Sequence, residues 1–364
     1  MQHALSALVA VVLGGLAVLI LFAPFVVISY RRRGGLTVGR TAAWVALVVY
    51  GFALVTFTLL PLPDDATISC VTAVLDPLEV LRDIAREYVR GATLLGNAAL
   101  QQLAFNILFF VPLGFLLRML FGRGMLVAAL AGLTLSALIE VTQLTGVWGL
   151  FRCAYRLFDA SDLFANTAGA VAGSALALLL PGARAGVRAS PFDPRLPRPV
   201  TRARRLVALT VDLFACTVTP PVIVIVGELA TGLADRRMEE AMPWLIPCAG
   251  LVPLAAEGWS VLATGSTLGE RSTFLRGVTG RFPAVVARPV RFVAGIGGYA
   301  ALLACGVGPA AAVFAAVSVI AACAIPGRGL AHVLSGMRVE DARLPQGEDE
   351  AAYSDACDRA RSTR

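Results

Sequence analysis

The sequence predicts an all-α, polytopic helical membrane protein with about eight or nine transmembrane helices in two modules. Hydrophobic residues make up 57% of the 364 residues, charged residues only 15%, and several apolar runs approach the length of a membrane span. A helix needs about 20 predominantly apolar residues to cross the hydrocarbon core. A soluble domain would not carry so many runs of this length, so a membrane protein is predicted.

The apolar runs define the predicted spans in chain order. They are 6–29, 41–61, 97–117, 125–145, 162–180, 206–227 and 242–263. A last tract, 292–325, would rise roughly 50 Å as one helix, well beyond a hydrocarbon core of about 30 Å. We therefore predict a hairpin that breaks at Gly306–Pro309, and the sequence leaves a single helix as the alternative.

Basic residues predict the orientation of the spans, because loops rich in Arg lie on the cytoplasmic side of a membrane. Three basic segments alternate correctly with the spans to share one side: Arg31–Arg40, Arg118–Arg123 and Arg184–Arg205. The intervening loop 62–96 is mainly acidic, which suits the outer face. The N-terminus is then expected outside, and the first apolar run is expected to be a retained anchor.

Composition divides the chain at a Pro- and Arg-rich segment without apolar periodicity, residues 181–204, which we interpret as a cytoplasmic linker. It separates a first transmembrane domain, 1–180, from a second, 205–341. Residues 342–364 are polar and acidic, which is typical of a disordered tail.

Residues 76–90 place apolar side chains at helical spacing within the loop between the second and third spans. Such a pattern is typical of an amphipathic helix on the outer membrane surface. A short helix packed on the bundle is an equal alternative.

Cysteine and histidine spacing does not predict a metal site, and we expect no cofactor. Cys70 and Cys153 both fall in predicted outer loops, where a disulfide is permitted. Free thiols are the favoured interpretation, because a shared side says little about distance. No nucleic-acid partner is expected, since all basic residues are Arg and the predicted loops account for the positive net charge.

Polar residues inside the spans of the first domain predict a functional site, because burying them in a membrane is costly. Glu140 and Gln143 share one helix face, and Asp162 and Asn166 share another. The topology brings these faces together toward the outer leaflet, around a predicted polar pocket. Its candidate residues are Asn106, Glu140, Gln143, Arg156, Asp159, Asp162 and Asn166. The alternative is a buried ion pair of Arg156 with Asp159 and Asp162 that only fixes helix order.

These motifs, together with Pro112-x-Gly114 and Gly169, resemble the VanZ-like family over roughly residues 6–180. The family usually has paired Asp where this chain has Ser161-Asp162. The resemblance implies a bacterial plasma-membrane protein of the cell envelope, and the family takes its name from low-level resistance to the lipoglycopeptide teicoplanin. It implies membrane lipids, a lipid-linked cell-wall precursor or a lipoglycopeptide as partners. The oligomeric state is left open.

The second domain carries its own intramembrane polar residues. Arg205 and Asp212 lie seven residues apart on one helix face, and Glu257 is expected at a depth similar to that of Asp212. Together with Gly265, Thr267, Gly269, Arg271 and the segment around His332, they resemble the RDD family over roughly residues 202–341. His332 stands where the family has its second Asp, and Glu270 stands where it usually has Lys.

The sequence supports three functional hypotheses. The leading one is a binding pocket in the outer leaflet that acts in cell-envelope homeostasis or glycopeptide tolerance. The second is a proton- or cation-coupled transporter that uses Asp212 and Glu257, and the third is a membrane scaffold. Catalysis is less favoured, because the first domain contains no nucleophile elbow, metal triad or Gly-rich phosphate loop.

Overall fold

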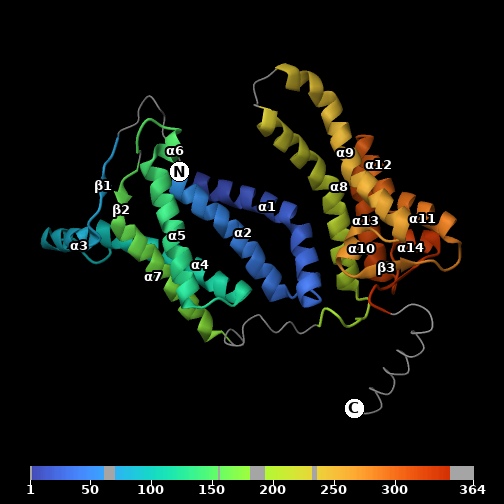
Figure 1. The fold of residues 1–364 in the computed structure, drawn as a ribbon, viewed down its shortest axis with the longest axis horizontal. Coiled ribbons are helices and arrows are strands. Elements are labelled where there is room, and N and C mark those ends of the chain that lie inside the picture. Colours follow the sequence, from blue (N-terminus) through green and yellow to red (C-terminus); the bar gives the residue numbers. More distant parts are fainter. Residues whose placement is uncertain (1, 61–69, 155, 181–192, 232–235, 345–364) are drawn as a thin grey trace, which may run out of the picture. The chain divides into compact units, whose positions relative to one another are not determined.

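The computed structural model describes residues 2–60, 70–154, 156–180, 193–231, 236–344 (Figure 1). Within these ranges the chain is mostly helical, which confirms the predicted fold class. Half of the predicted linker, 181–192, and most of the predicted tail, 345–364, lie outside the described residues. The part of the linker that is described already contains the start of a helix, at Arg202.

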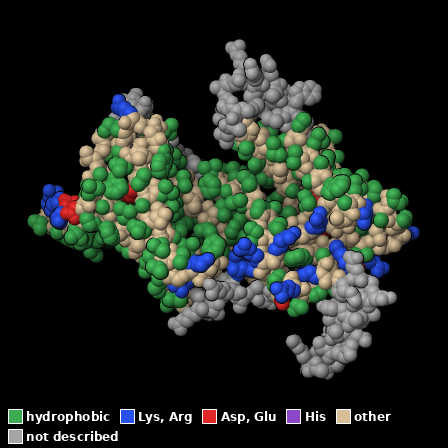
Figure 2. Space-filling view, in the orientation of Figure 1, with side chains coloured by type: hydrophobic (Ala, Val, Ile, Leu, Met, Phe, Trp, Pro, Cys, Tyr) green, Lys and Arg blue, Asp and Glu red, His purple; other side chains and the backbone are tan. Residues whose placement is uncertain are grey.

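Six helices of the described chain are long and apolar enough to cross a membrane, or seven if one bent pair forms a single span. Two further apolar helical segments, Cys248–Thr264 and Gly308–Ala324, are shorter than these candidate spans. The predicted number of eight or nine spans is reached only if these shorter helices also cross. Hydrophobic side chains cover most of the visible surface of the helices, as expected for a protein solvated by lipid (Figure 2).

The chain forms two compact units. Unit 1 comprises Met1–Val18 and Thr37–Ser190, and unit 2 comprises Leu19–Leu36 and Pro191–Arg364. The first helix therefore contributes one half to each unit.

The described residues of unit 1 form seven α-helices, one of which is shared with unit 2, a short 3₁₀ helix and two short strands. They are α1 (Gln2–Arg33, shared), α2 (Val38–Leu59), β1 (Ala73–Val74), α3 (Glu79–Val89), α4 (Ala98–Phe121), α5 (Met125–Leu144), α6 (Gly146–Gly149), β2 (Phe158–Asp159), α7 (Ala160–Leu176) and η1 (Ala177–Leu179). The helix predicted within 76–90 is confirmed as α3, whose charged side chains gather at the left edge of Figure 2. Its position on the membrane surface stays a prediction.

Glycines bring α7 into backbone contact with α4. A Cβ atom on Gly173 would lie 1.8 Å from the carbonyl oxygen of Val111, and one on Gly114 would lie 1.7 Å from that of Ala170. A Cβ on Gly169 would lie 2.1 Å from a third carbonyl oxygen. Gly169 and Gly173, four positions apart on α7, therefore form a small-residue surface on which the two helices approach closely.

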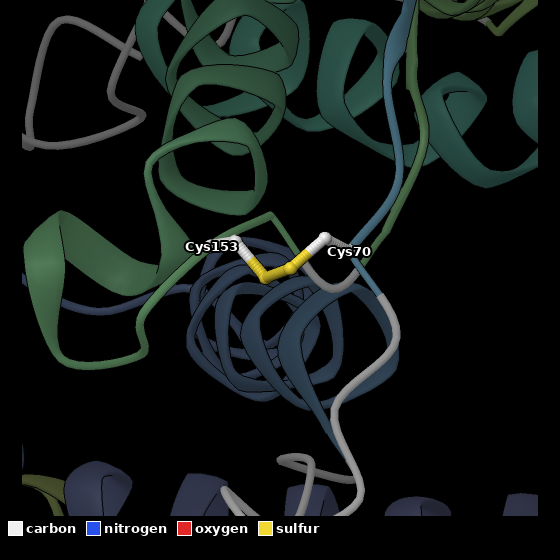
Figure 3. Close-up of a disulfide and its surroundings, with 2 residues drawn as sticks. All are labelled: Cys70 and Cys153. Carbon is white, nitrogen blue, oxygen red and sulfur yellow. A yellow bond between two sulfur atoms is a disulfide. The ribbon is translucent and has the colours of Figure 1, made fainter.

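A disulfide joins Cys70 to Cys153, with sulfur atoms 2.00 Å apart (Figure 3). The expectation of two free thiols was wrong. The chain returns to the start of α7 beside β1, and the parallel pairing of Ala73 with Phe158 holds the two loops together. Sequence spacing carried no sign of this return, because the two cysteines are 83 positions apart.

Replacing Cys70 by Ser should destabilise unit 1 by about 2–4 kcal/mol, because the disulfide closes a long loop in the unfolded chain. Thermal unfolding of the purified protein with and without a reducing agent measures the loss. Reduction should lower the Tm of the unsubstituted protein to that of the Cys70→Ser variant. The matched control is Cys248→Ser, which removes an exposed free thiol. An equal response of both variants to the reducing agent would contradict a stabilising role of the disulfide.

The described residues of unit 2 form the second half of α1, seven further helices and one small sheet. They are α8 (Arg202–Thr231), α9 (Arg236–Thr264), α10 (Leu268–Ser272), β3 (Leu275–Val278), α11 (Ala284–Val293), α12 (Ile296–Ala304), α13 (Gly308–Ala324), α14 (Leu330–Ser335) and β4 (Arg338–Asp341). β3 and β4 are antiparallel, with Leu275 opposite Asp341.

The predicted break of the last apolar tract is confirmed. α12 ends at Ala304, Gly306 adopts a left-handed φ of 73°, and α13 begins at Gly308. α12 is also bent by 41° from the preceding α11. The core of unit 2 lies between α8 and this hairpin, around Cys216 and Tyr299.

A buried ion-pair network fastens the start of α8 to β4. The guanidinium of Arg204 lies 2.6 Å from the carboxylate of Asp341, and that of Arg343 lies 2.7 Å from the same oxygen. Arg204 also donates to the carbonyl oxygens of Thr273 and Phe274, each at 2.7 Å. Two guanidinium groups therefore share one buried carboxylate.

Candidate functional site

Polar side chains from α4 and α7 meet inside unit 1. The Nδ2 atom of Asn106 donates to Oδ1 of Asp162 at a distance of 2.5 Å. Gln102, one helical turn before Asn106, also hydrogen-bonds to Asp162. The spacing of polar residues on two predicted spans thus corresponds to a contact between these spans.

A third and a fourth element add two more carboxylates. Asp159 precedes α7 and caps it, since its side chain accepts a hydrogen bond from the Ser161 amide at 2.8 Å. The backbone amide of Asp159 donates in turn to Oε2 of Glu140 on α5, at 3.2 Å. Glu140 is only 4% exposed. We refer to Glu140, Asp159 and Asp162 as the acidic cluster.

Asn166 lies one turn beyond Asp162 on α7 and contacts α5. Its Nδ2 atom donates to Oγ of Ser136 at 2.9 Å, and both side chains are buried. Ser136 was not among the predicted residues, and neither was Gln102. Ser136 lies four positions before Glu140, and Gln102 lies four positions before Asn106. Since residues four apart share a helix face, helical spacing from the predicted residues is the signal that would have identified them.

Gln143 and Arg156 form hydrogen bonds to residues outside the acidic cluster. Gln143 donates to the carbonyl oxygen of Thr58 at 2.7 Å, and Arg156 donates to that of Leu60 at 3.0 Å. Both side chains therefore donate hydrogen bonds to backbone carbonyl oxygens at the C-terminal end of α2. The alternative in which Arg156 forms an ion pair with Asp159 and Asp162 was wrong, because the guanidinium is directed to a backbone carbonyl.

The acidic cluster is consequently rich in hydrogen-bond acceptors. None of the three carboxylates of the acidic cluster forms an ion pair with Arg among the described residues of unit 1. The described residues also contain no group of three or more His, Cys, Asp and Glu that could hold a metal ion. Such a cluster is suited to a ligand that brings ammonium or other donor groups.

Unit 2 brings its own predicted acids together at the start of α10. Asp212 accepts a hydrogen bond from the Gly269 amide at 2.5 Å, and Glu257 accepts one from the adjacent Leu268 amide at 3.0 Å. The two carboxyl groups also hydrogen-bond to each other. Because a hydrogen bond between two carboxyl groups requires a proton on one of them, this pair is able to hold a proton.

Glu270 forms a second buried centre with two partners. The Arg291 guanidinium pairs with one carboxylate oxygen, and Nε2 of His332 lies 3.0 Å from the other. Burial favours a higher pKa for Glu270, but Arg291 and His332 outweigh it and hold the pKa below its usual range. Burial and the Arg291 charge lower the pKa of His332. Sequence spacing missed Arg291, which lies on α11 and matches no motif.

The remaining predicted residues of unit 2 shape the backbone around these acids. A Cβ atom on Gly269 would lie 2.0 Å from the carbonyl oxygen of Ala208, so glycine permits α10 to contact α8. Gly265 has a left-handed φ of 78°. Thr267 caps α10 by accepting from the Glu270 amide. Arg271 is mostly exposed and reaches Ser260 at 3.3 Å.

Arg205 is separate from both acid pairs. Its guanidinium donates to the carbonyl oxygens of Ile325, at 3.0 Å, and Arg328. These carbonyls follow the end of α13, where the helix dipole favours a positive charge.

The family model described as VanZ/LLP1 matches residues 47–181. This range contains the whole acidic cluster and the helices that carry it. No curated protein and no solved structure gives a significant match to the chain. The matched range includes none of the helices α8–α14, so the RDD resemblance gains no support from it.

Proposed function

Since residues 47–181 form a VanZ/LLP1 domain in a multi-pass membrane protein, we propose that its acidic cluster faces outward and binds a polar headgroup. The ligand is a membrane lipid, a lipid-linked cell-wall precursor or a lipoglycopeptide, and the role is cell-envelope homeostasis or glycopeptide tolerance in the bacterial plasma membrane. The observation that carries the proposal is that none of the carboxylates of the acidic cluster forms an ion pair with a basic side chain among the described residues, although Glu140 and Asp162 lie in candidate membrane spans, where an unpaired charge is costly.

The disulfide supports the outward direction. Cys70–Cys153 joins the segments that lead into β1 and β2, and β2 contains Asp159. Disulfides persist in oxidising compartments, which lie outside the bacterial cytoplasm. The positive-inside pattern, which puts the N-terminus outside, agrees with this direction.

Expression of the chain in a teicoplanin-sensitive host tests the proposal. We expect reduced susceptibility, and we expect Glu140→Gln and Asp162→Asn to abolish it at equal amounts of protein in the membrane. The matched control is Glu87→Gln on α3, which should leave susceptibility unchanged.

Two outcomes would count against the binding role. Unchanged susceptibility with confirmed surface expression would remove the glycopeptide role. Variants that lower the stability of the protein but keep the effect per molecule would support a scaffold instead. A mass spectrum of lipids that co-purify with the protein distinguishes a lipid or precursor headgroup from the antibiotic.

A second candidate function is proton- or cation-coupled transport by unit 2. It is supported by the hydrogen-bonded pair of Asp212 and Glu257 and by the resemblance to the RDD family. The two departures from that resemblance, Glu270 and His332, lie 3.0 Å apart.

Asp212→Asn should abolish ion flux in proteoliposomes if this second function is correct, because the amide can no longer exchange the proton of the pair. A pH-sensitive dye inside the vesicles measures the flux. Glu340→Gln, on β4 in the same unit, serves as control and should transport normally. Flux that is identical in Asp212→Asn and the unsubstituted protein would exclude this mechanism.

A further inference from the structure

Unit 2 contains a cavity lined by both polar and apolar side chains. Its empty volume is about 740 Å³, part of which is open to the surroundings. Its lining includes Arg205, and the apolar side chains of Leu209, Leu213, Ile296 and Phe314 form part of its wall. We call this space the unit 2 cavity.

The acids that line the unit 2 cavity are already engaged. Glu270 pairs with Arg291 and contacts His332. Asp212 accepts from the Gly269 amide and hydrogen-bonds to a neighbouring carboxyl group. These carboxylates therefore have few free acceptor positions for a ligand.

Arg205 is in the opposite situation. Its side chain is 6% exposed. Among the described residues, its guanidinium group donates hydrogen bonds to two neutral carbonyl oxygens, those of Ile325 and Arg328. Its Nε atom is buried and has no hydrogen-bond partner among the described residues. A guanidinium group without an opposite charge is costly to bury, and it binds carboxylates and phosphates strongly.

We propose that the unit 2 cavity binds an organic anion, with its carboxylate or phosphate head on Arg205 and its apolar chain along Leu209, Leu213 and Phe314. The ligand chemistry is an anionic head on an apolar chain of medium length, either a free carboxylate or an anionic lipid. The site belongs to unit 2 and does not depend on the acidic cluster of unit 1 or on ion transport.

Binding of radiolabelled octanoate to the full-length protein in a neutral detergent tests the proposal. We expect saturable binding that unlabelled octanoate competes and that octylamine and octanol do not. Arg205→Gln should weaken it about tenfold or more, the effect of losing one charge-assisted hydrogen-bonded contact. Arg202→Gln, an exposed position one turn earlier on α8, is the matched control and should bind normally.

A second variant covers the case in which Arg205→Gln fails to fold because it loses the carbonyl contacts. Leu209→Trp fills the apolar wall and keeps Arg205, so it should block octanoate while Tm is retained. Displacement by short-chain phosphatidylglycerol at lower concentration than octanoate would assign the site to an anionic lipid. The proposal is overturned by the absence of saturable binding, by preferred binding of octylamine, or by equal affinity in the folded Arg205→Gln and unsubstituted proteins.

Discussion

Gly173→Ala should disrupt the packing of α7 against α4 and destabilise unit 1 by about 3 kcal/mol or more. The added methyl group would lie 1.8 Å from the carbonyl oxygen of Val111, far inside van der Waals contact. A backbone carbonyl in the middle of a helix has no rotamer with which to move aside. The helices must separate, and the hydrogen bond between Asn106 and Asp162 across the same pair of helices would be lost with them.

Thermal unfolding and size-exclusion chromatography of the purified variant measure this effect. The matched control is Gly51→Ala on α2, where an added Cβ meets nothing within 4 Å. That control should be neutral or stabilising by about 0.5–1 kcal/mol, because Ala favours a helix over Gly. A Gly173→Ala protein with unchanged Tm would show that α4 and α7 are not in backbone contact.

Asp341→Asn should destabilise unit 2 by about 3–5 kcal/mol, because it leaves the buried guanidinium of Arg204 and that of Arg343 without their shared counter-charge. Chemical unfolding of the purified protein measures the loss. Glu340→Gln is the matched control on the same strand, since its ion pair with Arg276 spans 3.5 Å and is partly exposed. The control should change stability by less than about 1 kcal/mol. Similar losses in the two variants would contradict a special role of the buried network.

The same carboxylate predicts a pH dependence. Burial alone would raise the pKa of Asp341, but hydrogen bonds from Arg343 and Arg204 outweigh it and lower the pKa to about 2. The folded pKa lies below the unfolded value of 3.8, so the network stabilises unit 2 fully above that value. The contribution should disappear as the pH falls from about 4 to about 2. Asp341→Asn should lack this loss, whereas Glu340→Gln should retain it.

Helix positions were predictable because hydrophobicity is a local property of the sequence. The apolar runs correspond to α1, α2, α4, α5 and α8, and the excessive length of 292–325 predicted its break at Gly306. The polar spacing on two spans was equally informative, since Asn106 and Asp162 hydrogen-bond to each other. In each case neighbouring residues along one helix carry the signal.

Contacts between distant segments were not predictable in the same way. The direction of Arg156 depends on where α2 ends, and the pairing of Arg291 with Glu270 depends on how α11 folds back onto α10. Neither distance follows from periodicity, because the intervening loops set it. The Arg205 side chain likewise matched a motif, but only the structure revealed that its hydrogen-bond partners among the described residues are carbonyl oxygens and not carboxylates.

The sequence by itself determined that this protein is a helical membrane protein with costly polar residues in its spans, because span length and burial cost are local quantities. Only the tertiary structure decided which polar residues meet. In the structure, a disulfide joins Cys70 to Cys153. Gln143 and Arg156 donate hydrogen bonds to the end of α2 and not to the acidic cluster. The physical reason is that hydrogen bonds, ion pairs and disulfides form only within a few ångströms, and the path of the whole chain determines these distances.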